Sequence, residues 1–189
     1  MKSMLSILAL QCLTPLLCAA SDLVTWVTPL DNQLPATLKP TKGEKSSTLE
    51  FVIRFFSREK ELWVQLYGFV GFKLTDEAGN DVQAEYERDS SPLPERADLL
   101  CVEPGNVVSS LWRVVVYKGD VYLPDRTGGS RGYKNLKPGK YRVHVGYDRG
   151  DEPPENSFVT KIEDNWIGPH RVLYRGTHEL GSFEFEWKP

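Results

Sequence analysis

The side chains that could carry chemistry gather between Asp148 and Arg171, late in the chain. This stretch holds carboxylates together with one tryptophan and one histidine. Carboxylates and imidazole serve acid–base chemistry and cation binding, and an exposed tryptophan is a strong contact residue. The candidate binding residues are Asp151, Glu152, Asp164, Trp166 and His170. The alternative is that the acids are only solvated and that Trp166 closes one end of the fold.

The histidines and acids do not follow a known metal-binding pattern. His144 is expected to point outward from the middle of a strand, and His178 follows His170 by eight positions. This spacing matches neither HExxH nor a zinc pattern, and no EF-hand spacing occurs. We therefore expect no metal ligands and no cofactor.

Nucleophile and recognition motifs are equally sparse. No Gly-x-Ser-x-Gly elbow occurs, so no catalytic residue is assigned. Arg149, Gly150 and Asp151 form the tripeptide that integrin-binding loops present. A three-residue match arises often by chance, so this tripeptide alone does not predict a function.

The N-terminal residues predict export. Lys2 is followed by an apolar stretch from Leu5 to Leu17 and by small residues at Cys18 and Ala20, which is typical of a signal peptide. We expect cleavage after Ala20, so that residues 1–20 form the signal peptide and residues 21–189 one domain in a secreted or periplasmic protein. The minor alternative is a lipid anchor on Cys18. The apolar stretch is too short for a transmembrane segment.

Composition restricts the partners. The 189 residues carry a net charge of −3 without a block of basic residues, so nucleic acid is not expected. A protein or a glycan is the expected partner, and the oligomeric state stays open. After cleavage only Cys101 would remain, which excludes an internal disulfide; its apolar neighbours predict a buried small side chain.

The elements that must hold these residues are strands. Apolar residues alternate with polar ones in several segments, and no segment has helical periodicity over three turns. The alternation predicts one shared face in each of three segments, with Glu50 and Arg54 on the opposite face of the first: Leu49, Phe51, Ile53 and Phe55; Tyr141, Val143, Val145 and Tyr147; and Phe183, Phe185 and Trp187. An antiparallel β-sandwich of about seven to nine strands with long loops is therefore expected, with Val82–Arg88 as a hairpin partner of the strand before it. The predicted strands are Leu23–Thr28, Thr48–Phe56, Leu62–Thr75 with a bulge or corner at Gly68 and Gly71, Val82–Arg88, Leu111–Tyr117, Val121–Leu123, Tyr141–Tyr147 and Leu180–Lys188, with Val107-Val108 as the start of another.

One motif resembles a known family. Leu136, Pro138, Gly139 and Tyr141 are similar to the tyrosine corner of the immunoglobulin-like and fibronectin type III-like sandwiches found in exported bacterial proteins. The resemblance implies that the Tyr141 hydroxyl bonds to backbone just upstream and that Asp120–Asn135 crosses between sheets. The cysteine pair of antibody domains is absent, and the loops at 89–110 and 148–171 are long. The motif implies a fold and no particular activity.

Three functions remain open on this basis. The first is an exported, non-catalytic binding or structural module. The second is an exported inhibitor, for instance of a protease, that presents a long loop to an enzyme cleft. The third is an enzyme whose catalytic residues are dispersed along the chain.

Overall fold

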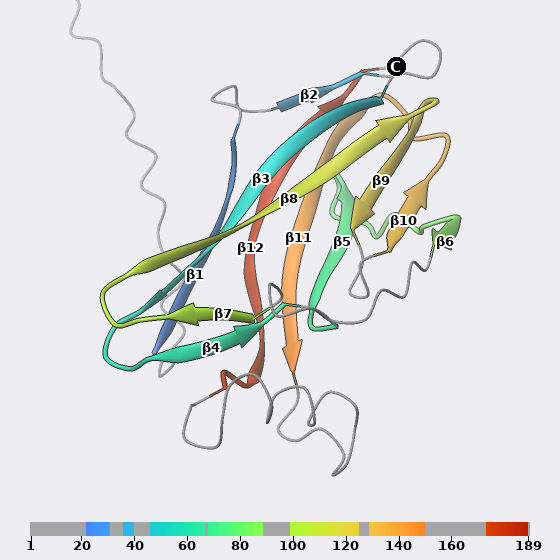
Figure 1. Ribbon diagram of the computed structural model, residues 1–189. Coiled ribbons are helices and arrows are strands. Elements are labelled where there is room, and N and C mark those ends of the chain that lie inside the picture. Colours follow the sequence, from blue (N-terminus) through green and yellow to red (C-terminus); the bar gives the residue numbers. More distant parts are fainter. Residues whose placement is uncertain are drawn as a thin grey trace, which may run out of the picture.

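The computed structural model describes residues 22–30, 36–39, 46–66, 68–88, 99–124, 129–149 and 173–188. These residues form twelve strands and no helix, which confirms the all-β class (Figure 1). The strands are β1 Leu23–Pro29, β2 Ala36–Leu38, β3 Ser46–Ser57, β4 Leu62–Gln65, β5 Val70–Asp76, β6 Tyr86–Arg88, β7 Leu99–Val102, β8 Val107–Tyr117, β9 Asp120–Pro124, β10 Ser130–Tyr133, β11 Gly139–Arg149 and β12 Gly176–Trp187.

The strands form two larger sheets and one small one. Sheet A has the order β1-β3-β8-β9-β10-β6, sheet B the order β2-β12-β11-β5, and sheet C consists of β4 and β7. Neighbouring strands are antiparallel except for β2, which runs parallel to β12. The long strand β8 crosses in front of sheet B at an angle to its strands (Figure 1).

Sheets A and B face one another across a core of alternating apolar side chains. On β3 the inward side chains are Leu49, Phe51, Ile53 and Phe55, none more than 2% exposed. The Phe51 ring lies 4.6 Å from the Phe183 ring of sheet B. Burying each large side chain contributes about 1.5–3 kcal/mol. The inward set predicted from the alternation on β3, β11 and β12 is therefore the observed core.

More strands are present than the seven to nine predicted. Five of the twelve, β2, β4, β6, β7 and β10, have only three or four residues. Of these, β2, β7 and β10 lie outside every predicted strand, because strands this short leave too few alternating positions to stand out in a sequence. The other seven have 5 to 12 residues and fall within the predicted number. One of the short strands, β7, lies within the stretch predicted to be a loop.

The predicted strand Leu62–Thr75 is divided into two strands at Gly68. Gly68 has a φ of +79° and separates β4 in sheet C from β5 in sheet B. This confirms the predicted corner at Gly68, because glycine adopts positive φ without steric cost. Gly71 lies inside β5, paired with Gly146 of β11, and forms neither a bulge nor a corner.

The predicted hairpin of Val82–Arg88 with β5 is wrong. Only the start of this segment follows β5, through a Thr75–Asp81 bridge and a 2.9 Å bond from the Val82 N–H to the Leu74 carbonyl. Tyr86–Arg88 then pairs with β10 of sheet A. The chain leaves β5 at the edge of sheet B and joins the other layer, which strand periodicity alone does not reveal.

The corner before β11 has the predicted hydrogen bond. The Tyr141 hydroxyl donates to the Lys137 carbonyl at 2.8 Å, and Gly139 has a φ of +156°. The Trp187 indole N–H donates to the Leu136 carbonyl at 3.0 Å, which ties the last strand to the same turn. The crossing between sheets is shorter than predicted, because most of residues 120–135 belongs to β9 and β10 of sheet A.

Candidate functional site

The loop residues proposed for binding from the sequence lie outside the described residues. This applies to Asp151, Glu152, Asp164, Trp166 and His170. Their role stays a prediction. The candidate site that the described residues do reveal is the outer face of sheet A.

Outward positions on β1, β3 and β8 line up in rungs across the three strands. Because the inner positions of β3 are buried, the intervening residues face away from sheet B. The strand registers place the outward side chains beside one another in four rungs: Val24–Phe56–Val107, Trp26–Arg54–Ser109, Thr28–Val52–Leu111 and Leu30–Glu50–Arg113.

This outer surface is unusually apolar. We call its seven large apolar members the apolar face: Val24, Trp26, Leu30, Val52, Phe56, Val107 and Leu111. Of these, Val52 is buried at 7% exposure, and Val24, Trp26 and Phe56 are half-buried. All three exposed large hydrophobic side chains in the described part of the chain belong to it, namely Leu30 at 43%, Val107 at 51% and Leu111 at 50% exposure. Antiparallel sheets normally pair an apolar inner face with a polar outer one, so the apolar face departs from the rule.

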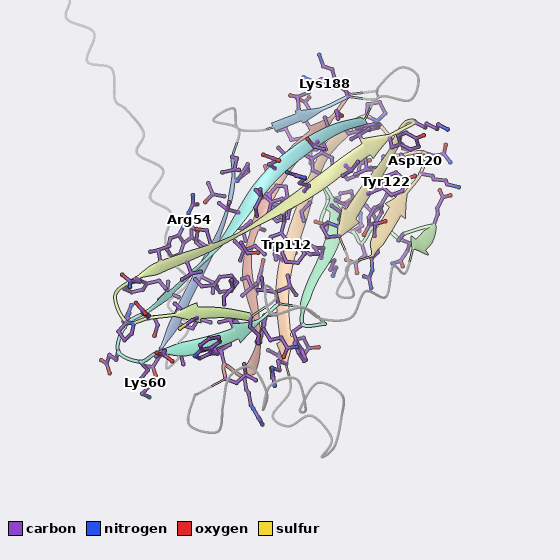
Figure 2. The ribbon with its side chains drawn as sticks, in the orientation of Figure 1. Arg54, Lys60, Trp112, Asp120, Tyr122 and Lys188 are labelled. Carbon is purple, nitrogen blue, oxygen red and sulfur yellow. The ribbon has the colours of Figure 1, made fainter. Side chains whose placement is uncertain are left out.

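Charges on the apolar face are few and partly paired. Arg113 donates from Nε to Glu50 Oε1 at 2.8 Å across the strands. Arg54, labelled in Figure 2, stands in the rung between Trp26 and Ser109 and makes no ion pair with a described residue. A patch of apolar side chains with few charges is a composition that protein-binding surfaces often have.

The outer face of sheet B follows the ordinary polar pattern. Beside it lies an open depression of about 940 Å³, formed by β5, β11, β12, part of β10 and residues 81–84. Its rim includes Lys73, which pairs with Asp81 at 2.7 Å, and Asp148, which accepts a 2.7 Å bond from Thr177. These groups satisfy one another, so the depression presents paired polar groups.

One chain of contacts in this depression resembles catalytic geometry. The His144 ring lies between Thr75 Oγ1, 3.2 Å from Nε2, and Glu179 Oε1, 3.2 Å from Nδ1. Hydroxyl, imidazole and carboxylate in this order are the parts of a nucleophilic triad. Thr75, however, is only 5% exposed, and its hydroxyl also lies 3.5 Å from the Arg142 carbonyl. A substrate would not reach this hydroxyl, so the contacts hold the His144 ring on the sheet, where the sequence predicted it to point outward.

The other described histidine lies on the opposite side of sheet B. His178 is half-buried, with its Nδ1 3.1 Å from the Tyr174 hydroxyl and its ring 5.8 Å from the Tyr147 ring. Desolvation lowers the pKa of His178 below its usual 6.5. Within the described ranges no three His, Cys, Asp or Glu side chains meet as metal ligands.

Two further sequence signals take a structural explanation. Arg149, the first residue of the integrin-type tripeptide, is 1% exposed; it donates to Gln65 at 2.9 Å and stacks on Phe69. It is therefore part of the interior and is not presented to a partner. Cys101 is half-buried, less than predicted, and packs with Trp63 in a small cluster at sheet C.

The apolar face was not predicted from the sequence, although the residue pattern contains a signal for it. On β3 the alternation assigned Glu50 and Arg54 to the outer face, yet Val52 and Phe56 share that face. Trp26 on β1 and Leu111 on β8 likewise occupy the outward positions of their own alternating strands. The residue alternation does not show which face of a strand the second sheet will bury, because that depends on how the sheets are layered. The alternation alone therefore could not identify this exposed surface.

Comparison with protein-family models, with curated proteins and with solved structures found no match. In the part of the chain that the structure describes, no helix is long and apolar enough to cross a membrane.

Proposed function

We propose that this protein is an exported, non-catalytic binding module that holds a partner protein on the outer face of sheet A. The observation that carries the proposal is the location of Leu30, Val107 and Leu111, the exposed large hydrophobic side chains, on one face of one sheet. An apolar area of this kind on a rigid sheet favours a protein partner over a glycan, which needs more polar groups. The predicted signal peptide at residues 1–20 supports action outside the cytoplasm.

We also propose that the fold is immunoglobulin-like. In that fold strands A, B and E share one sheet while C, F and G form the other, and the corner tyrosine lies near the start of F. The orders β1-β3-β8 and β12-β11-β5, with Tyr141 near the start of β11, agree with this arrangement. This fold by itself implies no particular activity, so the proposed binding function rests on the apolar face and not on the fold.

The inhibitor and enzyme alternatives depend on other residues. The inhibitor needs the 148–171 loop, of which residues 150–171 lie outside the described residues, and the enzyme needs dispersed residues that no motif identifies. No described feature favours either one over a binding module.

Site-specific crosslinking tests the proposed function. A photoreactive amino acid at Leu111 is expected to capture a specific exported protein from the native source, identified by mass spectrometry. The same amino acid at Arg142, on the outer face of sheet B, serves as the matched control. Arg113→Glu in the Leu111-labelled protein should weaken the capture, because it replaces the Glu50–Arg113 ion pair of the neighbouring rung by two carboxylates. If Leu111 captures nothing beyond the Arg142 control, the proposal is wrong.

A further inference from the structure

We propose that the apolar face binds the same face of a second copy of this chain, as a two-fold symmetric dimer. The inference deepens the proposed function by naming the partner, and rests on it. The axis would lie between the two stacked sheets and run along the Thr28–Val52–Leu111 rung. The pattern of side chains on this face is complementary to itself about such an axis.

The symmetry fixes which rungs meet. Two sheets stacked face to face keep their strands within about 30° of one another. With the axis along the central rung, the rotation places each strand opposite the same strand of the second copy, in the reverse direction. A residue two positions before the central rung on one copy therefore faces the residue two positions after the central rung on the same strand of the other copy. The Trp26–Arg54–Ser109 rung of one copy therefore faces the Leu30–Glu50–Arg113 rung of the second, and the reverse.

The charges match under this operation. Arg54 of each copy comes opposite Glu50 of the second copy, which gives two equivalent ion pairs. Glu50 already accepts from Arg113 within its own copy, so each carboxylate would bridge two guanidinium groups. Arg54 has no acidic partner among the described residues, so the dimer provides one. An interface in which residue i meets j and j meets i is the mark of a two-fold contact.

The apolar side chains match as well. Trp26 comes opposite Leu30 of the second copy, and Leu111 faces its own symmetry mate across the axis. Leu30 and Leu111 are 43% and 50% exposed in the single chain, so both lose apolar exposure on pairing. Apolar contacts at the centre with charged pairs beside them are the usual arrangement of a protein interface.

The area of the apolar face limits the affinity of the proposed dimer. Seven residues of β1 and the width of three strands span about 24 by 14 Å. This is small for a stable interface, which buries about 800 Å² per partner. We expect a reversible dimer that dissociates on dilution, rather than a permanent one.

Charge reversal in two separate chains provides the test. Sedimentation velocity of the purified domain, residues 21–189, should show a dimer that dissociates on dilution. Arg54→Glu brings two carboxylates together at each contact, and Glu50→Arg brings two guanidinium groups together there, so each variant alone should dissociate at least about tenfold more readily. Mixing the two variants restores opposite charges at both contacts, so the mixture should form a heterodimer. Lys140→Glu, the same reversal on the outer face of sheet B, should leave the dimer unchanged.

A second variant keeps the test independent of the Glu50–Arg113 pair. Leu111→Asp brings two carboxylates together at the axis and should also abolish the dimer, with an unchanged thermal melt showing that the chain still folds. A wild-type domain that stays monomeric at all concentrations, or a mixture that does not associate, would overturn the inference. A monomeric domain whose Leu111 position still captures another protein leaves the proposed function standing. If neither the dimer nor a crosslinked partner is found, both the dimer and the proposed binding function are wrong.

Discussion

At the scale of single residues, the contacts that surround the buried polar groups of Arg149 and Thr75 explain their positions. Arg149 is enclosed by Gln65 and Phe69, and Thr75 is enclosed by the sheet beside His144. Buried polar side chains require partners, and each of these has one within the interior. A motif or a contact geometry that resembles a functional site is therefore accounted for here by the packing around it.

His178 gives a prediction about pH at this scale. Burial lowers its pKa in the folded protein, whereas the unfolded chain titrates near 6.5. Below pH 6.5 the unfolded chain binds more protons than the folded one, so the free energy of unfolding should decrease as the pH falls through and below 6.5. Urea unfolding at a series of pH values measures this decrease.

Variants assign the effect to the residue. His178→Asn should remove this part of the pH dependence, because the side chain no longer titrates. His144→Asn, on the outer face of the same sheet, should leave it in place. An equal pH dependence in the wild type and in His178→Asn would show that burial of this imidazole does not matter.

At the scale of elements, the packing of β1 on β12 depends on a glycine. Gly181 has a φ of +147°, and a Cβ at this position would lie 3.0 Å from the Val27 backbone nitrogen. The register of β11 with β12 shifts close by, between Val145 and Gly146. The approach of the two sheets at this edge thus requires both the missing side chain and the glycine conformation.

Gly181→Ala should therefore lower the free energy of unfolding by about 1–3 kcal/mol, through backbone strain and the close contact with β1. Gly146→Ala is the matched control on the neighbouring strand, because a Cβ there meets no atom within 4 Å. Chemical denaturation of both variants measures the difference. Equal stabilities would mean that β1 can move away from β12 without cost.

At the scale of the whole molecule, the predicted export defines the mature domain. Cleavage after Ala20 should yield a chain that begins at Ser21, and the intact mass of the exported protein measures this. A mass increased by a lipid, and lost in Cys18→Ser, would favour the lipid anchor instead. An exported chain that retains residues 1–20 would show that the segment is not a cleaved signal.

The fold could be predicted from the sequence to the extent that it depends on local alternation. The inward sets of β3, β11 and β12, the corner at Gly68 and the Tyr141 hydrogen bond follow from residue types a few positions apart. The pairing of β6 with β10, the strand β7 and the parallel contact of β2 could not be predicted, because they join segments far apart in the chain and each covers only three or four residues.

The candidate site, in contrast, could be recognised almost only from the tertiary structure. The sequence by itself determined the strand periodicity, the approximate number of the main strands and the lack of a recognised catalytic or metal motif, since these depend on neighbours along the chain. Only the folded structure determined that sheet B covers the inner face of sheet A, whereas no other described strand covers its outer face. The physical reason is that two apolar faces of one strand look alike in sequence, and the second sheet can bury only one of them.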